Sequence, residues 1–358
     1  MQQTPLHDYH LSAGARMAEF GGWDMPIDYG SIIAEHRHCR EQVALFDICH
    51  MGEFLFTGDP VASGLDAALT LPVAKIPVGR SKYGFLLNDR GGVIDDLIVF
   101  RFAADRFFIV VNAATAANDF TVLKGRCRGG QLTDLSTQTG KIDLQGPLAR
   151  EVLRAQLGPA LDELKYFQFR HFPLLGEEVL VSRTGYTGEL GYELFISAAK
   201  VRALWDLLLT DPRVKPAGLG ARDILRLEIG YSLYGHELSE DITPLEAGLG
   251  MFVDFSREFT GKPALLNQQQ AGLARGKVAF TSATRRPARA GQKLFSGDAE
   301  IGVVTSGSFS PLVGCGFGLG MVQTAYTGAG KQLRLGSPAG DLLTVVELPF
   351  YQHGSVRN

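Results

Sequence analysis

The residues from Arg183 to Glu193 combine types that no buried core requires. The stretch reads Arg-Thr-Gly-Tyr-Thr-Gly-Glu-Leu-Gly-Tyr-Glu, with three glycines, two threonines, two tyrosines and two glutamates. The glycines permit tight turns, and residues 192–196 are suited to a strand. Glu193 therefore lies where a turn enters a strand, and its carboxylate could accept two parallel hydrogen bonds from a flat heterocycle with adjacent N–H groups. A hairpin carrying a solvated acid is the alternative.

A second candidate is the pair Asp95 and Asp96, inside the run Val-Ile-Asp-Asp-Leu-Ile-Val-Phe. Adjacent residues of a strand face opposite sides, so we expect one aspartate to meet solvent or a turn partner. The other, Asp96, should share a face with Ile98 and Phe100. An acid on an apolar face is costly unless it is paired or used, and burial raises its pKa towards the range of proton transfer. Alternatively, both aspartates belong to the turn and cap backbone amides.

A third group of polar residues lies on a predicted helix at 219–233. Arg222 is near its start, where it can reach a cavity. Asp223, Arg226 and Glu228 alternate with apolar residues and predict a partly buried structural ion-pair network. The remaining candidates are aromatic and amide side chains that could line a slot for a planar ligand, although each is most often a packing residue: Tyr83, Asn112, Tyr186 and Tyr192.

Several common catalytic and metal-binding patterns are missing. Gly218-Leu219-Gly220 lacks the third glycine of a dinucleotide-binding fingerprint, Gly261-Lys262 lacks the earlier glycine of a phosphate-binding loop, and no Gly-x-Ser-x-Gly is present. The four cysteines include no Cys-x-x-Cys pair, and His36 and His38 are two apart, so they face different ways on a helix. The sequence therefore gives little support to a dehydrogenase, a nucleoside triphosphatase, a serine hydrolase or a zinc-binding protein.

Strands and helices alternate over the first 270 residues, and strands alone follow. The expected strands are 52–58, 82–87, 93–100, 107–111, 137–144 and 178–182, and the expected helices are 31–43 with Ser31 as N-cap, 60–69, 113–125, 147–157, 199–209 and 219–233. A composition break at 268–275 predicts a linker. The glycine-rich, β-branched stretch 276–351 predicts a separate all-β domain, either a small barrel or a sandwich.

The composition is that of an ordinary globular protein. The 358 residues are 45% hydrophobic and 20% charged, which predicts two or three domains. The net charge of −3 gives no reason to expect nucleic-acid binding. No apolar run approaches the roughly 20 residues that span a bilayer, and we expect no signal or transit peptide at the N-terminus. We expect a cytoplasmic protein.

Short blocks along nearly the whole chain, taken in order, resemble the aminomethyltransferase family, the tetrahydrofolate-binding T-proteins of the glycine cleavage system. The blocks are 4–6, 20–26, 46–47, 50–53, 91–97, 145–147, 182–189, 216–223, 305–307 and 309–311. The resemblance implies an α+β fold of three domains, a cloverleaf around a central folate-binding channel, with a C-terminal all-β barrel-like domain. The implied domains are 1–50 with 138–270, 51–137 with the aspartate hairpin, and 271–358.

The resemblance also implies roles for individual residues. Asp96 corresponds to the family's catalytic aspartate, Glu193 to its pterin-binding glutamate and Arg222 to its folate-site arginine. No metal ligands are implied. The other implied folate-pocket positions are Met51, Leu55, Tyr83, Asn112 and Tyr186.

The activity that the resemblance implies is transfer of an aminomethyl carbon from the lipoyl arm of H-protein to tetrahydrofolate, with release of ammonia and formation of methylene-tetrahydrofolate. It requires neither metal nor flavin, and its partner is lipoylated H-protein rather than nucleic acid or membrane. Two alternatives stay open: a folate-dependent demethylase of another small donor, and a non-catalytic folate-binding accessory protein. Accessory relatives usually have Lys-Gly-Cys-Tyr-x-Gly-Gln-Glu where this chain has 183–189, so the stretch favours the transferase.

Overall fold

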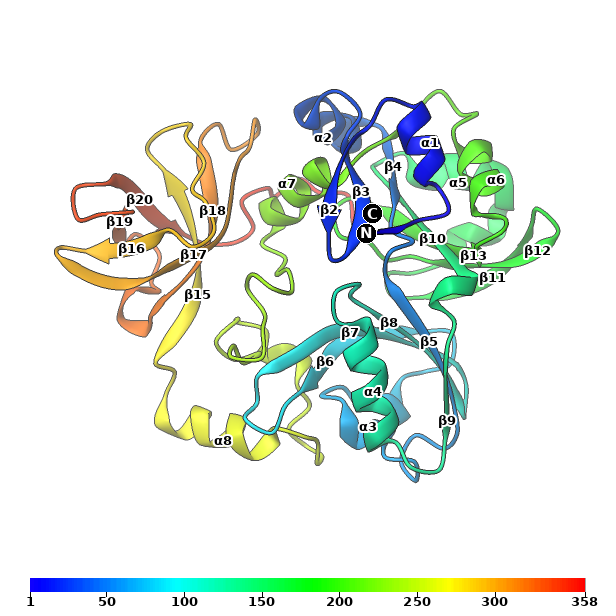
Figure 1. Cartoon of the computed structure of the whole chain (residues 1–358), viewed down its shortest axis with the longest axis horizontal. Coiled ribbons are helices and arrows are strands. Elements are labelled where there is room, and N and C mark those ends of the chain that lie inside the picture. Colours follow the sequence, from blue (N-terminus) through cyan, green and yellow to red (C-terminus); the bar gives the residue numbers. More distant parts are fainter. Residues whose placement is uncertain (358) are drawn as a thin grey trace.

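Three lobes, each built on its own β-structure, make up the chain (Figure 1). The structure is a computed structural model and describes residues 1–357. The expected mixed α+β fold with a C-terminal barrel is confirmed. Within these residues no helix has both the length and the apolarity needed to cross a bilayer.

The first lobe is a six-stranded sheet with helices on its faces. Its strand order is β11 (Phe169–Leu174), β12 (Glu177–Ser182), β13 (Gly191–Ser197), β10 (Thr139–Gln145), β4 (Val43–Asp47) and β14 (Val214–Pro216). Ile142 and Leu144 of β10 point into a core shared with α5 (Ala149–Leu157) and α6 (Val201–Leu208). Because side chains alternate along a strand, Lys141 and Asp143 project from the opposite face.

Helices α2 (Ile32–Glu41) and α7 (Leu219–Ile229) cover the side of β4 that carries Phe46. At the N-terminus, α1 (His7–Ser12) lies beside a small sheet of β1 (Gln2–Gln3), β3 (Trp23–Asp28) and β2 (Arg16–Phe20).

The second lobe is a five-stranded antiparallel sheet covered on both faces. Its order is β6 (Ser81–Leu87), β7 (Val93–Ala103), β8 (Arg106–Val111), β5 (Gly52–Thr57) and β9 (Gln131–Asp134). One face, with Leu97 and Val99, packs in a core with α3 (Leu65–Ala68) and α4 (Ala116–Arg126). The other face, with Phe100 and Phe108, packs against Phe195 of the first lobe. Neither face of β7 is therefore left to solvent.

The third lobe is a closed barrel. Its order is β15 (Arg275–Ser282), β18 (Gly316–Gln323), β17 (Ala299–Phe309), β16 (Lys293–Ser296), β19 (Gln332–Leu335) and β20 (Asp341–Val346).

Short 3-10 helices occur in all three parts of the chain. They are η1 (Val73–Lys75), η2 (Ser136–Gln138), η3 (Pro159–Glu163), η4 (Gly250–Phe252) and η5 (Thr324–Tyr326).

The segment that leads into the barrel packs on the second lobe. Helix α8 (Lys262–Ala271) and the chain before it place Leu238, Phe259 and Leu265 against Phe85 of β6. These residues lie within the stretch that we expected to belong to the first domain. The linker expected at 268–275 is wrong over its first half, because α8 continues to Ala271 before Gly272, with φ of +81°, ends it.

Two other boundaries follow from backbone chemistry. The helix expected at 219–233 ends at Ile229, since Gly230 adopts a left-handed conformation with φ of 82°. Ser31 caps α2 as expected, with its hydroxyl accepting a hydrogen bond from the Ala34 amide. Only 65–68 of the helix expected at 60–69 is helical.

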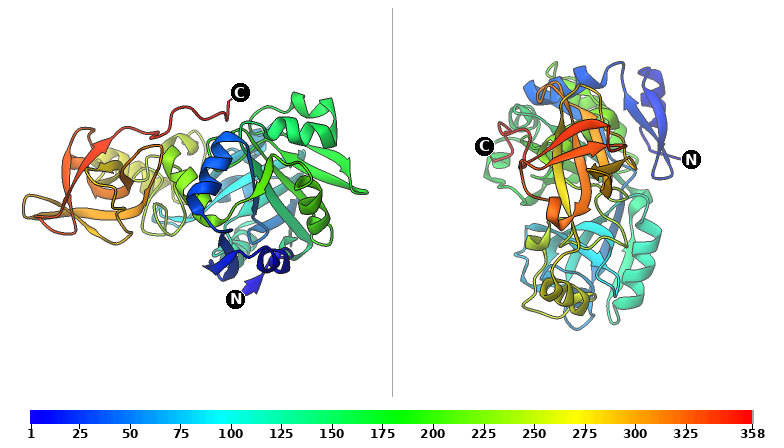
Figure 2. Two further views of the ribbon diagram at one scale, coloured as in Figure 1. Left: turned by 90° about the horizontal axis from the view of Figure 1, so that it is seen from above. Right: turned by 90° about the vertical axis from the view of Figure 1, so that its left-hand side faces the viewer.

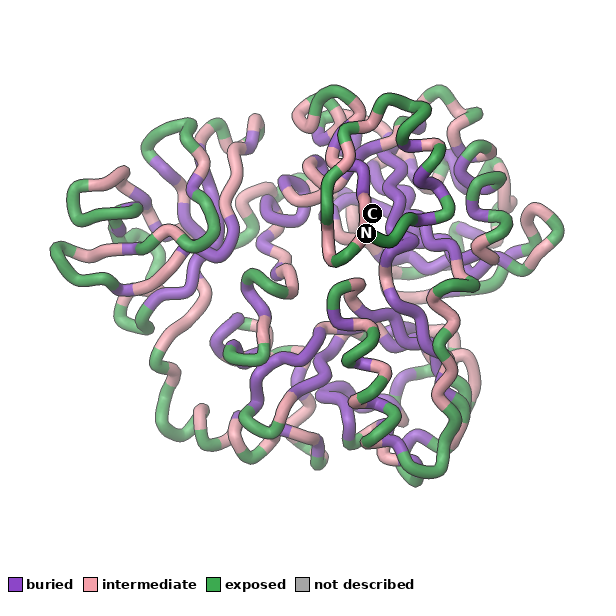
Figure 3. Tube along the Cα trace, viewed as in Figure 1, coloured by how far each residue is buried: buried purple, intermediate pink, exposed green. Residues whose placement is uncertain are grey.

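Buried ion pairs and the C-terminal segment fasten the lobes together. The ion-pair network expected on α7 is present: Arg226 bonds Asp223 and also Glu237, and donates to Ser306 of the barrel. Glu228 pairs with Arg40 of α2. After the barrel the chain returns to the first lobe (Figure 2), where Ser355 bonds Glu189. In Figure 3 the residues of the sheets and of α7 are mostly coloured as buried, and those of the outer loops as exposed.

Candidate active site

Asp96 lies on β7 with both carboxylate oxygens held by neighbouring side chains. The Tyr83 hydroxyl donates to Oδ2 at 2.9 Å, and Asn112 Nδ2 donates to Oδ1 at 2.9 Å. Burial, and next the charge of Asp95, raise the pKa of Asp96 to about 7, although the two hydrogen bonds oppose this rise. A group with this pKa exchanges a proton readily at neutral pH.

Asp95 faces the other side of β7 and is fully buried. Its carboxylate accepts the Asn112 amide N–H at 2.9 Å and Asn112 Nδ2 at 2.8 Å. The sequence left two environments open for the aspartate on this face, solvent or a turn partner, and the structure shows the turn partner. The reading in which both aspartates cap backbone amides holds for Asp95 only. The Asn112 side chain, which lies just after β8, joins the two carboxylates.

Glu193 lies in the middle of the first sheet, opposite Asp143 on β10 and Ser182 on β12. Thr184 donates its hydroxyl to Glu193 at 2.5 Å, and Lys141 Nζ lies 3.2 Å from Oε1. Burial alone would raise the pKa of Glu193, but the Lys141 ammonium and the Thr184 bond hold it below its usual range. The turn expected before this strand thus ends at a buried, ionised acid rather than a solvated one.

Arg222 neutralises the neighbouring carboxylate on the same face of the sheet. Its Nη1 lies 2.5 Å from Asp143 Oδ2, and its guanidinium lies 5.1 Å from the ring centre of Tyr186. The cross-strand acids Asp143 and Glu193 therefore each have their own cation. The result is a compact polar surface with two positive and two negative charges.

The remaining predicted residues lie around these two groups. Tyr186 donates its hydroxyl to the Ser232 carbonyl and is within electrostatic range of both Tyr83 and Asp96. Met51 Sδ lies 3.3 Å from Lys141 Nζ. Leu55 is partly exposed on β5. The predicted Tyr192 is wholly buried in the core of the first lobe.

Three contributors were missed from the sequence: Lys141, Asp143 and Thr184. Residues 139–145 alternate between apolar side chains at 142 and 144 and polar ones at 141, 143 and 145. That alternation predicts a strand with one polar face, but usually such a face meets solvent. Here Lys141 is 1% exposed and Asp143 0%, because the polar face is buried within the molecule. The signal in the sequence that could have identified Lys141 and Asp143 was the polar face that the alternation at 139–145 predicts.

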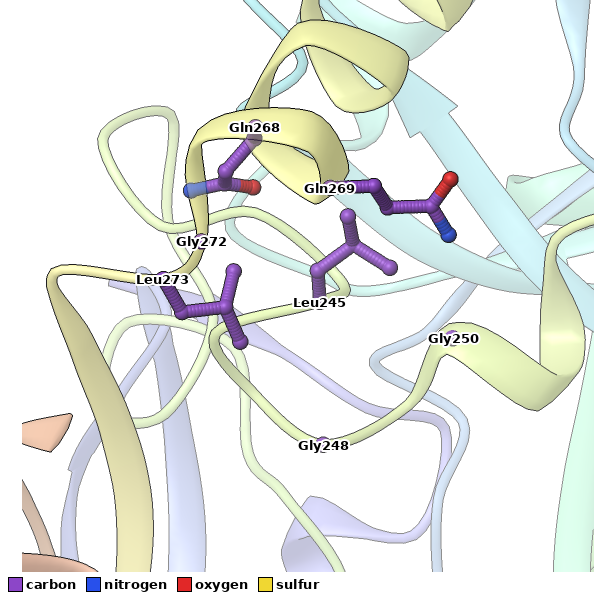
Figure 4. A pocket seen from close by; sticks show the side chains of 7 residues that line it. All are labelled: Leu245, Gly248, Gly250, Gln268, Gln269, Gly272 and Leu273. Carbon is purple, nitrogen blue, oxygen red and sulfur yellow. The ribbon is translucent and has the colours of Figure 1, made fainter.

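One surface hollow lies away from these residues. It encloses about 410 Å³ between the end of α8 and the loop before η4 (Figure 4). Leucines, glycines and two glutamines line it, without a titratable group, so it offers no acid–base chemistry. Within residues 1–357, no three His, Cys, Asp or Glu side chains are grouped so that they could hold a metal ion.

Comparisons with known proteins match the chain from end to end. Residues 6–257 match the family model of the GCVT N-terminal domain, and 275–352 that of the glycine cleavage T-protein C-terminal barrel domain. An aminomethyltransferase of Thermotoga petrophila is 40% identical over 100% of this chain and 99% of its own length. One of Halothermothrix orenii is 42% identical over 98% and 100%. The crystal structure of glycine cleavage system aminomethyltransferase T from Bartonella henselae aligns with a TM-score of 0.93, at 36% identity, over 99% of both chains.

Proposed function

The chain belongs to the glycine cleavage T-protein family of aminomethyltransferases, and from this premise we propose how its residues carry out the transfer. The family uses tetrahydrofolate as a substrate. In our proposal tetrahydrofolate accepts the carbon, the lipoyl arm of H-protein delivers it, and Asp96 handles the proton. The observation that carries the proposal is the carboxylate of Asp96, held by Tyr83 and Asn112 and poised with a pKa of about 7.

Glu193 fits the task of holding the pterin ring. A pterin presents adjacent N–H groups along one edge, and an ionised carboxylate can accept two of them in parallel. Lys141 and Thr184 keep Glu193 ionised despite its burial. Arg222, with Asp143, adds charge complementarity beside it. This arrangement fixes the acceptor before the donor arrives, which is how positioning lowers a barrier.

The transfer moves two protons from the folate nitrogens to the two released products. The C–S bond of the S–CH2–NH2 unit breaks, and the sulfur leaves as a thiolate. A folate nitrogen bonds to the carbon, ammonia departs, and the second folate nitrogen closes the ring. The two folate nitrogens lose one hydrogen each, while ammonia and the lipoyl thiol gain one each. Asp96 accepts a proton from the attacking nitrogen and delivers it onward.

A turnover assay tests this assignment of donor and acceptor. Purified protein is mixed with tetrahydrofolate and aminomethylated, lipoylated H-protein, and ammonia and methylene-tetrahydrofolate are followed together. We expect both products in equal amounts, and none when the lipoyl group is left out. Turnover with sarcosine or dimethylglycine, but not with H-protein, would instead identify a demethylase. Folate binding without any turnover would identify an accessory protein.

A further inference from the structure

A third buried acid, Asp119 on α4, faces the pair on β7. Its side chain is fully buried, and two hydrogen-bonding groups lie beside its carboxyl, the Thr115 hydroxyl and the carboxyl of Asp95. The nearby Thr115 hydroxyl donates instead to the Asn112 carbonyl at 3.1 Å. The polar group that Asp119 does meet is the carboxyl of Asp95, within hydrogen-bonding distance.

Two carboxyl groups can bond only when one of them carries a proton. An ionised carboxylate has no donor, so contact between two ionised groups would be repulsive and would lack a hydrogen. Asp95 already accepts two N–H groups from Asn112, which favours its ionised form. Asp119 accepts none. The proton therefore belongs on Asp119, whose O–H donates to Asp95.

The surroundings of the two acids favour one proton on the pair. Burial raises the pKa of Asp119 to about 7 and that of Asp95 well above its usual value, and no Lys or Arg of the described chain is among the groups that shift Asp119. The pair therefore keeps one proton at neutral pH, and the two Asn112 N–H groups bound to Asp95 place that proton on Asp119. The acids on other elements packed against α4 bond elsewhere: Asp66 of α3 accepts the Ala74 amide, and Asp134 of β9 accepts Ser136. The titratable groups that face Asp119 are Asp95, Asp96 and Tyr234.

We propose that Asp119 is a neutral carboxylic acid in the working protein and positions the catalytic group through a chain of hydrogen bonds. Its O–H holds Asp95, Asp95 holds Asn112, and Asn112 Nδ2 holds Asp96. The proposal rests on the role proposed for Asp96. Asp119 itself touches no reacting atom and is a positioning residue.

Two substitutions separate a neutral donor from a charge. Asp119→Asn keeps a donor of nearly the same shape, so kcat should stay within about threefold of the wild-type value. Asp119→Leu has a similar size but no donor, and kcat should fall about tenfold or more. Asn118→Leu, on the exposed side of α4, is the matched control and should leave kcat unchanged.

The pH dependence gives a readout that a purely structural role would not move. Wild-type kcat should decline on the alkaline side as Asp119 ionises, and Asp119→Asn should lose that decline. Stability should respond too, because the pKa of Asp119 is raised above the value of about 4 for an unfolded aspartate. The native state then binds more protons between about pH 4 and 7, so wild-type stability falls as pH rises through this window. In Asp119→Asn the urea midpoint should depend less on pH.

Infrared spectroscopy tests the proton without any turnover. Burial also raises the pKa values of Glu53 and Asp96, so the wild-type protein at neutral pH should show C=O bands from several buried protonated carboxyls. The difference spectrum between wild type and Asp119→Asn should isolate one such band, which belongs to Asp119. The proposal is overturned if Asp119→Asn loses no C=O intensity relative to wild type, if that variant is as slow as Asp119→Leu, or if Asp119→Leu is fully active. A wrong role for Asp96 would change the turnover results but not the band.

Discussion

Lys141→Met is the substitution that most directly probes how the acceptor is held. In the structure the Lys141 ammonium lies 3.2 Å from Glu193, and both side chains are buried. Methionine keeps most of the volume and removes the charge. Glu193 would retain the Thr184 hydroxyl, while Arg222 would stay committed to Asp143.

The expected loss follows from what happens to Glu193. Without the cation, burial raises its pKa, and a protonated carboxyl cannot accept two parallel hydrogen bonds. Losing one charge-assisted bond costs about 2 kcal/mol, which weakens the Kd for tetrahydrofolate roughly thirtyfold. The wild-type Kd should vary little between about pH 8 and 6, because the pKa of Glu193 is held low. The Kd of Lys141→Met should weaken further as pH falls through this range.

Anaerobic calorimetry with tetrahydrofolate measures both quantities, and a double-mutant cycle identifies the route of the effect. If Lys141 acts through Glu193, adding Lys141→Met to Glu193→Gln should change the Kd no further. The exposed Lys165→Met serves as a control of equal charge change. A wild-type Kd in Lys141→Met, or a loss that persists in full on the Glu193→Gln background, would refute the reasoning.

Two further substitutions test neighbouring parts of the account. Tyr83→Phe removes a hydrogen bond that lowers the pKa of Asp96. The acid limb of the pH profile of kcat should therefore move to higher pH, and kcat at neutral pH should fall about tenfold. An acid limb at the wild-type pH would contradict a hydrogen bond between Tyr83 and Asp96. Arg226→Met leaves Glu237 buried without its cation and should lower the free energy of unfolding in urea by about 3 kcal/mol. The exposed ion pair of Arg202 with Asp206 gives the comparison, since Arg202→Met should lower the free energy of unfolding by less than about 0.5 kcal/mol. Equal losses in the two variants would show that burial of the ion pair does not matter.

The fold was largely predictable because local patterns agree with the tertiary structure. The hairpin 82–100, the helix capped by Ser31 and the β-rich C-terminal domain all carry strong turn or periodicity signals. The failures have physical causes. Residues 268–271 are polar enough to suggest a linker, yet they complete α8, whose Leu265 packs on the second lobe.

The site was predicted less completely, because burial depends on how lobes meet. Alternation correctly separated Asp95 from Asp96, but it could not show that α4 covers the face with Asp95 and supplies Asp119. Nor could it show that the polar face of β10, with Lys141 and Asp143, is turned inward. A strand pattern reports which residues share a face, whereas the neighbour of that face comes from distant parts of the chain.

Single-turnover transfer by Asp96→Asn, measured beside folate calorimetry, tests the central claim most directly. Asparagine preserves the shape and a hydrogen-bonding oxygen but cannot take up the proton. We expect a Kd for tetrahydrofolate within about threefold of the wild-type value and a transfer rate lower by about 100-fold or more. Transfer at the wild-type rate in Asp96→Asn would show that the proton travels by another route.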